Sequence, residues 1–147
     1  MNSINQQLER AFGIALKAHE SQVDQQDQPY LLHLIRVMLK VNGPAQVVAL
    51  LHDLVEDTVW TGEDLLREGF DPAIVEAVLA LTRRADETYA QFIDRVQGTP
   101  LAIPVKIADL EDNLGRLDGL AQIDPAKAES LGKRYRKAHA QLIQLVR

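Results

Sequence analysis

Four ionisable side chains crowd the end of an apolar segment that reads VVALLHDLVEDT. They are His52, Asp53, Glu56 and Asp57. On a helix, His52 lies one turn from Glu56 and Asp53 one turn from Asp57, so the four form one polar patch. Carboxylates buried together raise each other's pKa, and a divalent cation removes that repulsion. The alternative is a helix end that simply enters solvent, although acidic residues oppose the helix dipole at a C-terminus.

Two further segments place one polar side chain after apolar residues. His33 lies within PYLLHLIRV, where a lone histidine is more often a core residue than a ligand, and Asp109 follows VKIA, where it also fits the acidic end of a helix. Combined with His52 and Asp53, they supply two imidazoles and two carboxylates. Such a set fills four positions of an octahedral shell and leaves two for water or substrate oxygens. The combination predicts a metal site.

The composition restricts both the metal and the partners. The 147 residues include no cysteine, which excludes disulfides and thiolate ligands and favours Mn, Mg, Fe or Zn bound by nitrogen and oxygen. The net charge of −5 argues against nonspecific binding to nucleic acid, while a bound metal still allows a small phosphorylated ligand. The chain has no apolar run long enough for a bilayer, and its start, MNSINQQLER, lacks a signal sequence. We therefore expect no membrane partner and a cytoplasmic location.

The hydrophobic periodicity that must position these residues is helical nearly throughout. The segment 23–28 is polar and predicts an exposed loop, and we find neither strand alternation nor an internal repeat or linker. We therefore predict one all-α domain over residues 1–147, in which the partly apolar last helix is a candidate surface for homo-oligomers. The expected helices cover about 4–22, 29–41, 44–58, 61–69, 71–81, 87–96, 101–117 and 124–146.

The pattern of a histidine, a His-Asp pair and a later aspartate resembles the HD-domain metal-dependent phosphohydrolases. The segments AHESQ, QPYLLHLIRV, LLHDLVEDT and VKIADLEDNL are similar to the hydrolase domain of the bifunctional guanosine tetra- and pentaphosphate synthetase/hydrolases, and more so to their small stand-alone relatives. The resemblance covers residues 18–117, and VEDT is its most specific element. It implies an HD-domain helical bundle that removes the 3′-pyrophosphate of ppGpp, usually with Mn²⁺; Fe or Zn also suits the ligand set.

The resemblance also implies roles for individual residues. Glu56 and Asp57 match the pair that positions and deprotonates the attacking water, and Asn113 matches a residue near the sugar and phosphates. Lys106, three residues before Asp109, and Arg36, three after His33, are candidate phosphate contacts by their spacing alone. The implied metal ligands are His33, His52, Asp53 and Asp109.

One segment departs from the family. The alarmone hydrolases carry a basic run where this chain reads VDQQDQ over residues 23–28. An aspartate there repels a polyphosphate, whereas an arginine would stack on guanine and neutralise phosphate charge. Three interpretations stay open: hydrolysis of a guanosine 3′-pyrophosphate, hydrolysis of another nucleotide or phosphoester, and a catalytically silent domain that binds a nucleotide.

Overall fold

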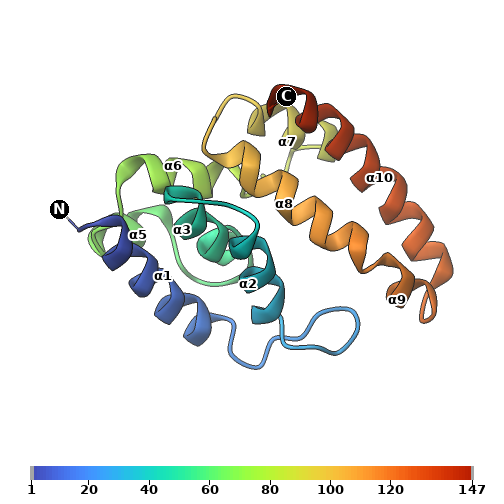
Figure 1. Ribbon diagram of the computed structural model, residues 1–147, viewed down its shortest axis with the longest axis horizontal. Helices are drawn as coiled ribbons and strands as arrows, with labels where there is room; N and C mark the ends of the chain where they lie inside the picture. Colours follow the sequence, from blue (N-terminus) through green and yellow to red (C-terminus); the bar gives the residue numbers. More distant parts are fainter. Residues whose placement is uncertain (1, 147) are drawn as a thin grey trace.

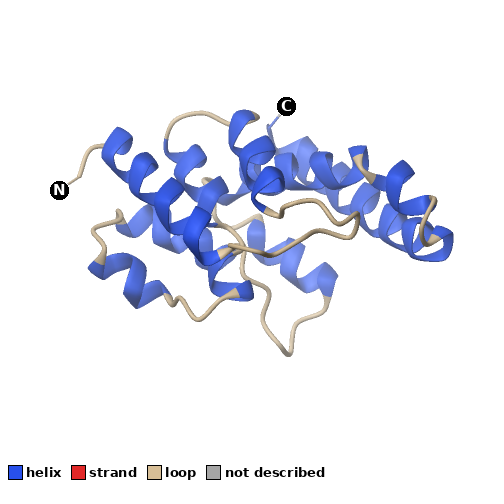
Figure 2. Cartoon of the chain, turned by 90° about the horizontal axis from the view of Figure 1, so that it is seen from below, coloured by secondary structure: helices blue, strands red, loops and turns tan. Residues whose placement is uncertain are grey.

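The chain forms helices joined by mostly short loops in this computed structural model, which describes residues 2–146. Figures 1 and 2 show no strand in that part of the chain, so the all-α prediction is confirmed. The elements are α1 (Ile4–Ala18), α2 (Leu31–Leu39), α3 (Pro44–Leu51), α4 (Leu54–Asp57), α5 (Gly62–Arg67), α6 (Pro72–Ala80), α7 (Tyr89–Val96), α8 (Ala102–Gly115), α9 (Leu117–Ala121), α10 (Pro125–Ile143) and a 3₁₀ turn, η1 (Gln144–Val146).

Local signals explain where many of these helices begin. Ser3, Thr61 and Thr88 each accept a hydrogen bond from the backbone N–H three residues ahead, in reciprocal capping boxes that start α1, α5 and α7. Helices α3, α6 and α10 have proline in the first turn, where its missing N–H breaks no helical hydrogen bond. The helix predicted from residue 61 therefore begins with its own capping box.

The expectation of one continuous helix through the HD segment is wrong. Helix α3 ends at Leu51 and α4 begins at Leu54, because Asp53 has φ −104° and ψ 1°, outside the α-helical region. The residues of α3 from Val47 to Leu51 are fully buried, whereas Glu56 and Asp57 on α4 are exposed. A break between the helices lets the chain leave the core without burying these two carboxylates.

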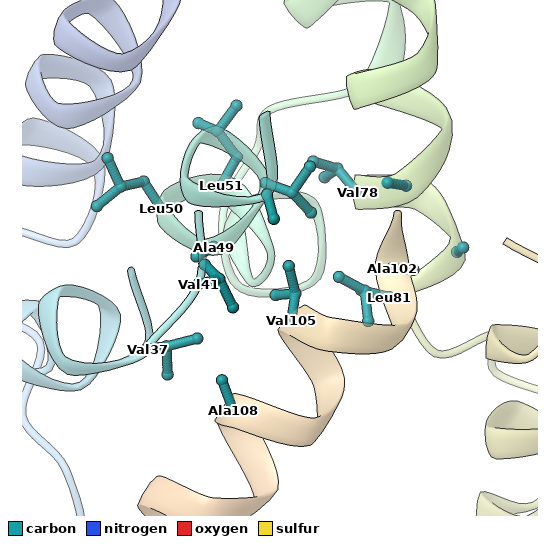
Figure 3. Close-up of a cluster of buried hydrophobic side chains, with 14 of the residues drawn as sticks. Val37, Val41, Ala49, Leu50, Leu51, Val78, Leu81, Ala102, Val105 and Ala108 are labelled. Atoms are coloured by element: carbon teal, nitrogen blue, oxygen red, sulfur yellow. The ribbon is translucent and has the colours of Figure 1, made fainter. Parts of the chain in front are cut away.

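Helix α3 lies among α1, α2, α6 and α8 and carries much of the core. Figure 3 shows Leu50 and Leu51 of α3 together with Val37 of α2, Val78 of α6 and Val105 of α8. Burying a side chain of this kind stabilises the fold by about 1.5–3 kcal/mol relative to leaving it exposed. Because α2, α3 and α8 also contact one another, the three predicted metal-site segments are held on one packed framework.

The C-terminal half adds a second layer beside α8. Helix α10 runs along α8 and α9, and Figure 1 shows α9 near the far end of this layer. The predicted helix over 101–117 ends at Gly115 instead, and α9 follows it. Within residues 2–146, none of the helices has the length and apolar character needed to cross a membrane.

Candidate metal centre

Three of the four predicted ligands converge from three different helices. His33 on α2, His52 directly after α3 and Asp109 on α8 are all buried, and their ligand atoms lie within 4.8 Å of one another. Asp109 Oδ1 is 2.8 Å from His33 Nε2 and 3.4 Å from His52 Nε2. The contact between α2, α3 and α8 thus brings together residues that are far apart in the sequence.

His52 shows that this donor set fits a cation. Its Nδ1 lies 2.6 Å from the carbonyl oxygen of Ala49, which only accepts hydrogen bonds, so Nδ1 carries the proton and donates it. The buried Nε2 has no hydrogen-bond partner and faces Asp53 Oδ2 at 3.2 Å and Asp109 Oδ1 at 3.4 Å. A lone pair that faces two carboxylate oxygens is repulsive unless a positive charge lies between them, and a divalent ion supplies one.

Asp53, the fourth predicted ligand, borders the three-residue cluster through His52. Its side chain is 16% exposed, and its Oδ2 accepts a hydrogen bond from the Tyr30 hydroxyl. Burial, together with the nearby carboxylates of Asp109 and Asp57, raises the pKa of Asp53 well above its usual range. Asp53 is therefore held beside other negative charges without a cationic side chain in direct contact, as expected of a metal ligand.

Behind His33, the structure shows a supporting carboxylate that was not among the predicted site residues. Asp112 Oδ2 lies 2.7 Å from His33 Nδ1, and Arg36 donates to both Asp112 oxygens at 2.7 and 3.1 Å. Burial opposes the charged forms of His33 and Asp112, but their mutual hydrogen bond and their other partners outweigh it. The pKa of His33 rises to about 9 and the pKa of Asp112 falls to about 2. The spacing of Asp112, one turn after Asp109 on the same face, was the available signal.

Lys106 supports Asp109 from the other side. Its Nζ donates to Asp109 Oδ2 at 2.9 Å and lies 5.2 Å from the ring centre of Phe92 and 5.7 Å from that of Tyr89. Burial opposes the charged form of Asp109, but the charge of Lys106 and the hydrogen bond with His33 outweigh it and hold the pKa of Asp109 well below its usual range. The ammonium group of Lys106 is thus already paired with a carboxylate. The contact between Lys106 and a substrate stays a prediction.

The two predicted catalytic acids lie on α4, one turn beyond Asp53. Both side chains are exposed, and Glu56 Oε1 accepts a hydrogen bond from the backbone N–H of Arg83 at 2.9 Å. The backbone N–H of Asp57 donates to the carbonyl oxygen of Asp53 at 2.9 Å, which places Asp57 one helical turn from that predicted ligand. Their catalytic role stays a prediction, as does the metal-ligand assignment.

A cavity of about 420 Å³ opens beside the cluster and is bordered by His33, Asp53 and Asp109. This volume lies in the range of small-molecule sites. Two of the three predicted substrate contacts, Asn113 and Arg36, line the cavity, and Lys106 does not. The other lining residues come from the loop before α2 and from the C-terminal layer; they are Val23, Asp24, Gln25, Gln26, Tyr30, Arg116, Leu117, Leu120, Leu131 and Tyr135.

No protein-family model matches the chain. It is 32% identical over 120 residues to a probable GTP pyrophosphokinase of Mycobacterium leprae, which covers 73% of the chain and 15% of that protein. It is 29% identical over 133 residues to a guanosine-3′,5′-bis(diphosphate) 3′-pyrophosphohydrolase of Haemophilus influenzae, which covers 82% of the chain and 20% of that protein. A similarly named protein of Aquifex aeolicus is 28% identical over 125 residues, which is 76% of the chain and 18% of the relative. The chain thus spans one fifth or less of the length of these relatives.

The fold has a close counterpart among solved structures. The structure described as "A metazoan ortholog of SpoT hydrolyzes ppGpp and plays a role in starvation responses" superposes with a TM-score of 0.71. The match covers 95% of this chain and 94% of that one at 22% sequence identity, so it shows a shared fold. Together, the sequence and fold comparisons confirm that the chain resembles the hydrolase domain of the (p)ppGpp synthetase/hydrolases.

Proposed function

From this resemblance, we propose that the chain is a metal-dependent phosphohydrolase that removes the 3′-diphosphate of a guanosine nucleotide, with guanosine 3′,5′-bis(diphosphate) as the first substrate to test. The observation that carries the proposal is the unpartnered Nε2 of His52 opposite two carboxylates, beside a cavity of nucleotide size. Two relatives named 3′-pyrophosphohydrolases indicate the reaction class.

In this proposal two imidazoles and two carboxylates would hold a divalent cation, Mn²⁺ by preference; Fe²⁺ or Zn²⁺ would also suit these donors. When bound, the cation supplies Lewis acidity and makes a water molecule acidic enough to attack near neutral pH. The hydrogen bonds from His52 to the Ala49 carbonyl and from His33 to Asp112 fix the orientation of both rings, with each Nε2 facing Asp109. The residues that would hold it are His33, His52, Asp53 and Asp109.

The exposed acids of α4 are proposed to accept a proton from the attacking water. Glu56 and Asp57 lie one turn from Asp53 and would align the water and accept its proton. The water oxygen joins the phosphorus bonded to O3′ of the nucleotide, the P–O3′ bond breaks, and O3′ takes up a proton. One substrate and one water thus yield pyrophosphate and a 3′-hydroxyl nucleotide. Asn113 and Arg36, which line the cavity, are proposed to contact the substrate's sugar and phosphates.

A second candidate function is hydrolysis of another nucleotide or phosphoester by the same site. The observation that favours it is the loop before α2, which carries no basic residue and pairs its own Asp24 with Arg116 at 3.0 Å. Arg116 is therefore already neutralised at the edge of the cavity.

The test is a panel of nucleotides and phosphoesters incubated with purified, Mn²⁺-loaded protein, with release of pyrophosphate and phosphate measured separately. We expect pyrophosphate from the guanosine 3′-pyrophosphates, and loss of this activity in the double variant Glu56→Gln, Asp57→Asn. Glu76→Gln, an exposed position on α6, is the matched control that keeps activity. Turnover of other phosphoesters alone would support the second candidate. No turnover of any substrate despite stoichiometric metal would contradict both and indicate a silent nucleotide-binding domain.

A further inference from the structure

The loop between α1 and α2 is shaped by the side chain of Asp24. Asp24 Oδ1 accepts hydrogen bonds from the backbone N–H groups of Gln26 at 2.8 Å and Gln28 at 3.0 Å. The backbone N–H of Asp24 also donates to the carbonyl oxygen of Gln28 at 2.8 Å. An aspartate that binds backbone groups two and four residues ahead holds a turn closed. The loop is therefore ordered by its own residues, and Asp24 has a second oxygen available.

That second oxygen joins the loop to the opposite side of the cavity. Asp24 Oδ2 accepts a hydrogen bond from Arg116 Nη2 at 3.0 Å, across 92 positions in the sequence. Gln26 Nε2 donates to the carbonyl oxygen of Arg116 at 3.1 Å. The Gln26 amide also lies against Gly119 of α9, where a Cβ atom would collide with it. Two side chains of the loop thus contact the junction of α8 and α9, and both line the cavity.

The contact between Asp24 and Arg116 neutralises one of the positive charges that line the cavity. Two arginines line it, and each is paired with an aspartate: Arg116 with Asp24, and Arg36 with Asp112 at 2.7 Å. Among the described lining residues, no cationic side chain is without a carboxylate partner. A phosphate group bound beside Arg116 would meet a guanidinium whose charge is already balanced, and the adjacent carboxylate of Asp24 would repel it. The remaining lining of this part is apolar, amide-bearing or, at Tyr135, phenolic, and suits an uncharged group.

We propose that Asp24 is a specificity-determining residue. By neutralising Arg116, it makes the part of the cavity away from the metal ligands selective for an uncharged moiety. The preferred substrates are then nucleotides whose phosphates all lie at the metal end, such as a nucleoside 3′-diphosphate with a free 5′-hydroxyl. Nucleotides with an additional 5′-diphosphate are disfavoured. This inference rests on the proposed function, which it refines by naming the substrate class.

Substitution of Asp24 by asparagine isolates the charge from the loop geometry. Asn keeps a side-chain oxygen for the backbone N–H groups of Gln26 and Gln28 but leaves Arg116 without a counter-charge. Asp27→Asn is the matched control, because Asp27 is exposed on the same loop and its positive φ of 62° suits asparagine. Asp24→Asn with Arg116→Gln removes both charges and should behave like the wild type.

The experiment measures two quantities on Mn²⁺-loaded protein: kcat/KM for guanosine 3′-diphosphate against guanosine 3′,5′-bis(diphosphate), and calorimetric affinity for guanosine 3′-phosphate against guanosine 3′,5′-bisphosphate. We expect the wild type to prefer the 5′-hydroxyl member of each pair by about tenfold, on the scale of one unpaired charge–phosphate contact. Asp24→Asn should lose most of that preference, while Asp27→Asn and the double variant should keep it. Circular dichroism confirms that each variant is folded.

The outcomes separate this inference from the proposed function. The inference would be overturned if the wild type showed equal kcat/KM and equal affinity for both members of each pair. It would also be overturned if Asp24→Asn and Asp27→Asn changed the preference to the same extent. If no substrate is hydrolysed but the binding preference and its loss in Asp24→Asn are observed, the proposed reaction fails and the selectivity of the cavity stands.

Discussion

The carboxylate of Asp112 lies 2.7 Å from Nδ1 of His33, although the two residues are 79 positions apart. This contact leaves Nε2 of His33 directed at Asp109, at 2.8 Å. A carboxylate behind a histidine fixes the tautomer and the orientation of the ring and increases its basicity as a metal ligand. The pair therefore ties α2 to α8 and prepares one side of the candidate metal centre.

Asp112→Asn is expected to weaken Mn²⁺ binding by about 10- to 100-fold, because a neutral amide is a weaker acceptor for the Nδ1 proton of His33 and makes Nε2 a less basic ligand. Competition of the purified protein against a fluorescent chelator measures the affinity. Asp118→Asn on α9, which is exposed, removes the same charge elsewhere and should leave the affinity unchanged. An unaltered affinity in Asp112→Asn would show that this carboxylate only packs the helices together.

His52→Ala is expected to abolish stoichiometric metal, since its unpartnered Nε2 is the atom that most needs a cation. Elemental analysis after gel filtration gives the metal content. His139→Ala is the matched control. His139 lies on α10, its side chain is 25% exposed, and it contacts Glu111 of α8 at 3.0 Å. Metal retained at full occupancy in His52→Ala would refute the proposed ligand set.

Removal of the metal is expected to lower the thermal midpoint by several degrees, because an ion that binds only the folded state stabilises it by mass action.

In the metal-free protein, Asp53→Asn should raise the midpoint. The raised pKa of Asp53 means that its ionised form is unfavourable beside Asp109, so stability is present at low pH and lost as pH rises through the raised pKa. Asparagine removes that charge and can still accept from Tyr30. Calorimetry with and without chelator tests both statements, and a lower midpoint for metal-free Asp53→Asn would contradict the second.

Glu87 and Arg95 are expected to determine part of the acid stability. The Arg95 guanidinium and the backbone N–H of Arg84 hold the pKa of Glu87 at about 2, below its usual 4.5. A depressed pKa contributes stability above the ordinary value, and this contribution is lost as pH falls from about 4.5 toward 2. Glu87→Gln should therefore be destabilised at pH 7 and approach the wild type near pH 2.

Urea unfolding between pH 2 and pH 7 measures this convergence. Glu63→Gln is the control, since Glu63 forms an exposed pair with Arg67 in which both side chains are more than two-thirds exposed. Parallel curves for Glu87→Gln and the wild type over the whole range would mean that the charge of Glu87 is not what stabilises the region.

Short-range rules are sufficient to predict part of this fold. Helix caps at Thr61 and prolines at the start of α3, α6 and α10 act through neighbours within one turn, and the all-α prediction followed from apolar spacing. The division of the HD segment was not predicted, because a 3.6-residue pattern cannot show that His52 and Asp53 leave the helix. Helix α9, which follows α8 after a single residue, was not predicted either.

The sequence by itself determined the chemistry available to this protein: two imidazoles and several carboxylates in segments otherwise apolar, with no thiolate to compete as ligand. Only the tertiary structure decided which partner each group meets. His33 meets Asp109 and Asp112 across 76 and 79 positions, and Asp24 meets Arg116 across 92. Local spacing carries no information on such pairs, because the packing of α2 against α8 and the closure of the loop before α2 bring them together.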